Sequence, residues 1–251
     1  MRYHFDLIRN LVQRDFSLSY RRSALGMLWS LLLPLAQLLV LVFVFQAVVP
    51  LRIEAYPAFV FSALLPWTWF STCVTAAADI FVNNRDLVRR PNFSPAILMV
   101  VNTLSNFVTY LVALPILLGI LVWYGRTLTP ALLLFPVLAL AQGLLMVGIG
   151  LLVGTFNVFY RDVHYIVSLG LMLLFYLTPI FYQPRELLGG YHLIYALNPA
   201  AGLIESYRAI FFYGVAPGAG QLGLVAVSSL VMASLGYLFY RREADDIIDH
   251  L

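Results

Sequence analysis

The sequence contains no lysine, and all 15 of its basic residues are arginine. A Walker A loop needs a lysine on the nucleotide phosphates, so this chain cannot itself be a P-loop ATPase. Schiff-base catalysis needs a lysine amine and is excluded on the same ground. The absence of one residue type therefore removes two classes of enzyme from consideration.

Cysteine and histidine are scarce as well. The single cysteine, Cys73, cannot form an intrachain disulfide or a thiolate metal cluster. The four histidines, at positions 4, 164, 192 and 250, include no pair at the spacing of metal ligands. No Ser/His/Asp or Cys/His set has a spacing that would support nucleophilic catalysis. We therefore expect no metal, no catalytic residue and no cofactor on this chain.

Charge is the third shortage: charged residues make up 11% of the 251 residues and apolar residues 62%. A soluble domain has about 25% and 45–50%. Six stretches contain no Asp, Glu or Arg, and each is long enough to cross a bilayer, which takes about 20 apolar residues. They are residues 23–51, 55–78, 91–125, 127–160, 163–184 and 209–240. The sequence therefore predicts an all-α integral membrane protein with a single transmembrane domain, 1–251, and no nucleic-acid partner.

The spans are expected as six helices, with arginine asymmetry setting their orientation. If the N-terminus is cytoplasmic, the inner segments carry 11 arginines and the outer segments carry four. Both termini are therefore predicted to lie in the cytoplasm. The six predicted spans are residues 29–50, 57–80, 98–123, 131–155, 164–183 and 221–240.

Two segments between the termini and the spans have distinct patterns. Residues 1–22 place apolar side chains on one half of a helical wheel and polar ones on the other, which predicts an amphipathic helix in the membrane interface. Residues 184–220 combine Pro and Gly breakers with an apolar, aromatic stretch. A seventh span would put the C-terminal arginines outside, so two short re-entrant helices at the outer face are expected instead.

The spans offer small and aromatic residues rather than charges. Gly150 and Gly154 have the small-xxx-small spacing that lets membrane helices approach closely, either within or between subunits. Asp79, near the inner end of the second span, is expected to be a satisfied or snorkelling carboxylate. Several aromatics are assigned to interface belts, and three at the outer end of the fifth span are predicted to line a path for sugars. The belt set is Trp29, Trp67, Trp69, Trp123 and Tyr124, and the path set is Tyr176, Phe181 and Tyr182.

An ordered series of short motifs resembles the permease subunits of type-2 ABC exporters, and most closely those of O-antigen, capsule and teichoic acid export. The series begins with Arg14-Asp15-Phe16 and Tyr20-Arg21-Arg22-Ser23. It continues through NNRDLVRRPNFSP (83–95) and Phe159-Tyr160-Arg161-Asp162, and then through Thr178-Pro179-Ile180-Phe181-Tyr182 and Asn198-Pro199. These points extend over nearly the whole chain in order.

The resemblance implies a homodimer in a bacterial inner membrane, with two P-loop ATPase subunits that carry ATP and Mg²⁺ on its cytoplasmic face. The substrate implied is a glycan on an undecaprenyl diphosphate carrier. Arginines of the inner interface are predicted to meet that diphosphate or to anchor anionic lipid. The predicted ATPase-coupling residues are Asn84, Arg85, Asp86, Arg89, Arg90, Arg161 and Asp162, and the diphosphate residues are Arg14, Arg21 and Arg22.

Three other functions stay open on the sequence alone. A drug or small-molecule exporter permease would have the same six spans. A membrane glycosyltransferase or polymerase would need buried carboxylates that the spans lack. A passive channel would conduct without nucleotide.

Overall fold

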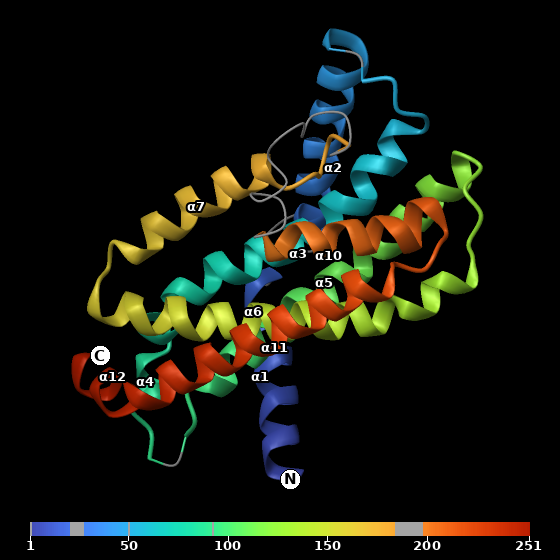
Figure 1. Ribbon diagram of the computed structural model, residues 1–251. Coiled ribbons are helices and arrows are strands. Elements are labelled where there is room, and N and C mark those ends of the chain that lie inside the picture. The colour runs from blue at the N-terminus through green and yellow to red at the C-terminus, as the bar shows by residue number, and fades with distance from the viewer. Residues whose placement is uncertain (1, 21–27, 50, 92, 184–197) are drawn as a thin grey trace.

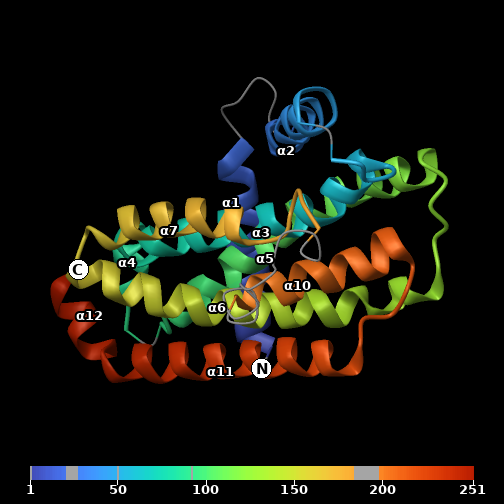
Figure 2. The ribbon, with the colours of Figure 1, turned by 45° about the horizontal axis from the view of Figure 1, so that its top comes forward.

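The computed structural model describes residues 2–20, 28–49, 51–91, 93–183 and 198–251, and every regular element in these ranges is a helix (Figure 1). Figure 2 shows most of the long helices lying side by side across the view, whereas the helix of residues 28–42 at the top is seen nearly end-on and so crosses them steeply. In chain order the elements are α1 (Arg2–Tyr20), α2 (Leu28–Val42), η1 (Phe43–Val48), α3 (Tyr56–Asn83), α4 (Arg85–Val88), α5 (Ala96–Trp123), η2 (Pro130–Leu134), α6 (Phe135–Phe159), α7 (Val163–Leu177), α10 (Pro199–Arg208), η3 (Ala209–Tyr213), α11 (Ala219–Arg242) and α12 (Ala244–His250).

Five of the six predicted spans coincide with helices that are long and apolar enough to cross a membrane. They are Leu28–Val48, Tyr56–Asn83, Ala96–Trp123, Pro130–Phe159 and Ala219–Arg242. The remaining one is represented by α7, whose 15 residues give about 22 Å of helix. That is less than the roughly 30 Å of a hydrocarbon core, so a sixth span over 164–183 stays a prediction.

Helix α3 is the centre of the bundle, packed against α2, α5, α6, α7 and α10. Polar side chains join it to its neighbours at mid-length. The Gln142 side-chain amide of α6 donates to the Pro66 carbonyl (2.8 Å), and the Asn102 amide of α5 donates to the Cys73 carbonyl (2.9 Å). The assignment of Trp67 and Trp69 to an interface belt is wrong. Both indoles are buried near the middle of α3, where the bundle supplies apolar contacts that a belt position would lack.

Glycines let α6 pack closely on both of its sides. A Cβ added at Gly148 would collide with the backbone of Met232 in α11, and one at Gly236 would collide with the backbone of Gly148. Gly150 and Gly154 face α3 and α5 instead: a Cβ on Gly150 would lie 3.1 Å from the Ala77 Cβ. The predicted close approach at these glycines is therefore made within one subunit, and Figure 2 shows α11 running beside α6.

The two segments with distinct sequence patterns, residues 1–22 and 184–220, form helices over most of their described residues. In α1 the buried Leu11 side chain faces the bundle and Arg9 and Asn10 are exposed, as an amphipathic helix requires, and the helix packs on α5. The helix α10 begins as Asn-Pro predicts, with the Asn198 side chain accepting from the Ala200 amide. It continues as η3 to Gly214 at φ +65°. Residues 184–197 lie outside the described residues, so the re-entrant arrangement of 184–220 stays a prediction.

Candidate functional site

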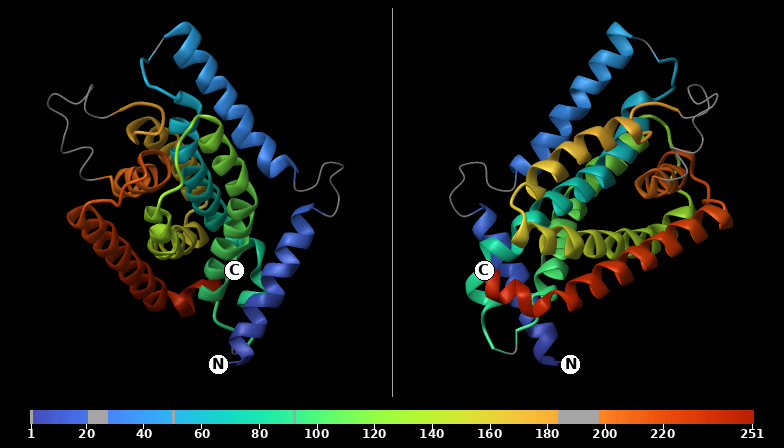
Figure 3. Two further views of the ribbon diagram at one scale, coloured as in Figure 1. Left: turned by 90° about the vertical axis from the view of Figure 1, so that its right-hand side faces the viewer. Right: turned by 60° about the vertical axis from the view of Figure 1, so that its left-hand side comes forward.

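The predicted coupling segments lie together at one end of the bundle. Helix α4, the α6–α7 turn and α12 share this end with the start of α1 (Figures 1 and 3). A small apolar cluster holds α4 and α12 in place: Phe81 of α3, Val88 of α4, Leu98 and Met99 of α5, Leu151 of α6, Tyr240 of α11 and Ile247 of α12 belong to it. One packed layer therefore connects α4 and the C-terminal helix α12 to the ends of the spans.

Helix α4 is a single turn anchored by one buried side chain and otherwise open to solvent. Val88 is buried in the cluster, whereas the predicted coupling residues Arg85, Asp86, Arg89 and Arg90 are exposed. The helix is held at its start by Asn84, whose backbone carbonyl accepts from the amides of Leu87 and Val88. Because α4 is anchored by one buried residue and surrounded by exposed charged side chains, it is suited to dock into a recess of a partner protein.

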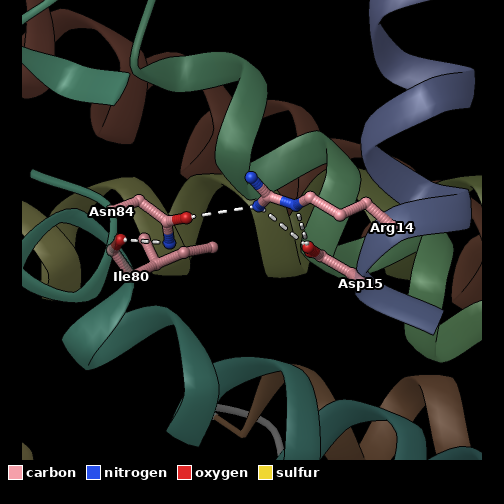
Figure 4. Close-up of polar contacts among 4 residues, drawn as sticks. All are labelled: Arg14, Asp15, Ile80 and Asn84. Atoms are coloured by element: carbon pink, nitrogen blue, oxygen red, sulfur yellow. Dashed lines mark hydrogen bonds and ion pairs between the residues drawn. The ribbon is translucent and has the colours of Figure 1, made fainter. Parts of the chain in front are cut away.

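Asn84 also joins α4 to the amphipathic helix α1 (Figure 4). The Arg14 guanidinium Nη2 lies 3.4 Å from the Asn84 Oδ1 and 3.0 Å from the Asp15 Oδ1. The Asn84 side-chain amide in turn donates to the Ile80 carbonyl at the end of α3 (2.9 Å). The structure therefore brings a predicted diphosphate residue to a predicted coupling residue. Arg21 and Arg22 lie outside the described residues.

The second predicted coupling segment lies at the α6–α7 turn, where Arg161 and Asp162 are exposed. Beside it is a polar cluster that the sequence pattern does not reveal, because its members Asp79, Asn157 and His164 come from three different helices. The Asp79 carboxylate of α3 accepts from the Asn157 amide of α6 (3.1 Å) and lies 2.8 Å from His164 Nδ1 of α7. The Asn157 Oδ1 accepts from the His164 backbone amide (3.2 Å). Three helices are therefore tied together next to the turn.

The three predicted path aromatics form one group at the opposite end of α7. The ring of Phe181 lies 5.1 Å from that of Tyr182 and 6.2 Å from that of Tyr176 between centroids. Phe45 of η1 stacks on Phe181 at 5.1 Å. Tyr176 is 60% exposed, and the other two predicted residues are half-buried. These rings therefore present an aromatic surface between η1 and α7.

The non-helical segment 178–182 that carries Phe181 and Tyr182 is fixed by polar groups from α3 and from the two ends of α10. The Arg208 guanidinium of α10 donates to the carbonyls of Pro179 and Ile180 (2.9 Å to Ile180) and lies 3.9 Å from the ring centre of Phe59. The Tyr56 hydroxyl of α3 donates to the Phe181 carbonyl (2.9 Å), and the Asn198 amide donates to Thr178 Oγ1 (2.9 Å). The carbonyls of Pro179, Ile180 and Phe181, which lie outside a helix, are therefore hydrogen-bonded, as non-helical backbone inside a membrane requires.

Glu205 lies three residues before Arg208 on the same helix, a spacing that permits an ion pair. Among the described residues no ion pair joins these two side chains, and Arg208 is buried with its guanidinium on carbonyl oxygens. The sequence signal for this role is the breaker Thr178-Pro179. A segment that leaves the helical ladder at membrane depth needs a donor from elsewhere.

Comparison with known proteins gives one consistent result. A family described as ABC-2 type transporter matches residues 6–212. The chain is 35% identical over 242 residues to the O-antigen export system permease protein RfbA of Myxococcus xanthus, covering 95% of this chain and 93% of that one. It is 29% identical to a protein of the same name from Klebsiella pneumoniae (96% and 93%). It is 23% identical to the polysialic acid transport protein KpsM of Escherichia coli (96% and 95%).

Proposed function

The chain belongs to the ABC-2 type transporter family, and we propose that it is the membrane-spanning subunit of an ATP-driven exporter that moves a lipid-linked polysaccharide across the bacterial inner membrane. The observation that carries this proposal is the match, over nearly the whole of both chains, to permeases named for O-antigen export and polysialic acid transport. The spans support it, because they hold aromatic and uncharged polar groups rather than the charge clusters of ion-driven transporters.

ATP hydrolysis is assigned to a separate subunit, because a chain without lysine cannot form a Walker A loop. Two copies of that subunit are proposed, one for each copy of this chain. The docking surface in this proposal comprises α4 and the α6–α7 turn. Exposed Arg89 and Arg90 directly follow α4, and exposed Arg161 and Asp162 lie in the turn. Motion of α4 would reach α3 through Asn84 and Ile80, and motion of the turn would reach α3 through His164 and Asp79.

The substrate path in this proposal runs between two copies of the chain, with the coupling end in the cytoplasm together with both termini. The diphosphate of the carrier is assigned to Arg14, Arg21 and Arg22, because guanidinium binds phosphate oxygens in pairs. Arg14 is half-exposed and contacts Asn84. A bound diphosphate would therefore compete for the contact between α1 and the coupling loop, which gives substrate binding a route to the ATPase.

Co-purification of the tagged chain from its native membrane tests the proposal. We expect a stoichiometric P-loop ATPase to remain bound and its hydrolysis to respond to undecaprenyl-diphosphate-linked glycan. The double substitution Arg89→Ala and Arg90→Ala should abolish association or export, because it removes the two charges at the end of α4. Arg52→Ala is the matched control, since Arg52 is exposed in the α2–α3 loop at the other end. A chain that purifies alone and conducts or reacts without ATP would rule out the exporter.

A further inference from the structure

The central helix α3 is covered on every side but one. From Ala58 to Ala78 the only residues that are not buried are Ala76 and four hydroxyl residues, Thr68, Ser71, Thr72 and Thr75. These four residues, at i, i+3, i+4 and i+7, lie on one face of the helix and are called here the hydroxyl stripe. A helix face that meets lipid is apolar, so this uncovered face has the wrong chemistry for acyl chains.

Two neighbouring helices, α2 and α5, place polar side chains in the same groove as the stripe. A groove of about 510 Å³ lies between α2, α3 and α5, and each helix contributes polar residues to it. The pairs are Ser30 and Gln37 from α2, Thr68 and Thr72 from α3, and Asn106 and Thr109 from α5. Gln37, Thr68 and Asn106 lie near the middle of their spans, so the polar part of the groove is at the depth of the bilayer centre.

The groove continues into the surface that carries a predicted path aromatic. A second hollow, of about 340 Å³, is lined by Gln37, Thr68 and Ser71 together with Phe175 and Tyr176 of α7. Gln37 and Thr68 line both hollows. A third, of about 370 Å³, follows the stripe further along α3 to Thr75. The stripe is therefore the common wall of all three hollows.

The hollows are lined by polar but uncharged side chains, which determines the kind of ligand that they can bind. They offer hydroxyls and amides but no charged side chain, so they do not provide the arginines that a diphosphate needs. Thr68 and Ser71 donate to carbonyls of their own helix, which keeps their oxygens as acceptors. Among the described residues, the side chains of Thr72 and Gln37 make no hydrogen bond. Such a surface matches the many hydroxyls of an uncharged sugar ring, with the nearby aromatic rings available for stacking.

We infer that the hydroxyl stripe and Gln37, with Asn106, form a mid-membrane binding surface for the saccharide units of the exported glycan, separate from any site for its lipid diphosphate. The inference rests on the proposed export function. Here the sugars exchange their bonds to water for bonds to the stripe, so no single unit is bound tightly and each can be replaced by the next. The surface thus lowers the barrier to crossing without holding the polymer.

Thiol labelling in the assembled transporter tests this inference, and the single buried cysteine makes it practical. Cys73→Ala removes the native thiol, and Thr72→Cys then places one in the stripe. We expect a water-soluble maleimide to label this thiol and undecaprenyl-diphosphate-linked glycan to protect it. Undecaprenyl phosphate, which has the carrier but no sugar, should not protect. Protection by both probes would assign the groove to the acyl chain, and absence of labelling in an exporting transporter would show that another helix covers it. Either result overturns the inference.

Substitutions in the same assembly separate binding from folding. Gln37→Leu and Thr72→Val remove polar atoms with little change in shape. They should raise the half-saturating concentration of glycan in the ATPase assay about fivefold to tenfold, the loss of one hydrogen bond each. Thr72→Ser keeps the hydroxyl and should stay near the parent value. If the parent transporter exports glycan and all three variants keep its half-saturating glycan concentration, the inference about the stripe is refuted and the proposed export function stands. A parent that exports no glycan would refute the proposed function.

Discussion

Helices α3 and α2 are both apolar spans, but α3 is mostly buried by neighbouring helices and α2 is mostly exposed. In the most apolar window of α3, 78% of the residues are buried, against 11% in the span of α2 and η1. Helix α7 resembles α2, since none of its residues is buried. Mean hydropathy does not explain the difference, because the α2 span is the more apolar of the two. Contact with protein therefore marks α3 as the framework, and leaves α2 and α7 as surfaces for lipid or for a second copy.

Lipid provides no hydrophobic force between helices, so the framework depends on close backbone contact. Gly236→Leu should give the largest loss of stability, because its side chain would occupy the space of the Gly148 backbone and separate α11 from α6. We expect no folded protein by size-exclusion chromatography in detergent. Gly223→Leu, on the same helix with nothing within 4 Å of an added Cβ, should behave like the parent. A folded Gly236→Leu variant would contradict the packing of α11 described here.

Matched leucine substitutions test the comparison between α3 and α2 directly. Leu64 of α3 is fully buried, and Leu39 of α2 is 69% exposed. Leu64→Ala leaves a cavity in the framework and should lower the free energy of unfolding by about 2–5 kcal/mol. Leu39→Ala should change it by less than about 0.5 kcal/mol in the isolated subunit. Thermal unfolding in detergent measures both. A larger effect of Leu39→Ala would show that α2 is covered, which is the result expected if a second copy packs there in the purified protein.

Much of the fold could be predicted from the sequence, because the bilayer imposes a simple rule. Stretches without charge must be helices of spanning length, and five of them begin and end within a few residues of the predicted bounds. The α1 helix and the Asn198-Pro199 helix start were also recognisable, since amphipathic periodicity and capping are local properties.

Properties that depend on neighbours could not be predicted. Trp67 and Trp69 have the composition of belt residues, but whether an indole meets headgroups or other helices is decided by the packing around α3. Asp79, Asn157 and His164 are separated in the sequence by up to 85 positions and meet only when α3, α6 and α7 are adjacent. The hydroxyl stripe is visible as a spacing, yet serine and threonine can face a partner helix as well as a groove. Only the burial of every other face of α3 separates these possibilities.

The smallest expected effect concerns a hydrogen bond between the framework and the end of the exposed helix α7. The Tyr56 hydroxyl of α3 donates to the Phe181 carbonyl, just beyond the end of α7. Tyr56→Phe keeps the buried ring and removes this bond, so it should lower the free energy of unfolding by only about 1 kcal/mol. It should slow export more than this loss suggests, because the segment that carries Phe181 and Tyr182 loses a fixed point. Tyr165→Phe on the exposed face of α7 is the control. Equal export by the two variants would mean that Arg208 and Asn198 suffice to position the aromatic surface, and that α7 depends on α10 more than on α3.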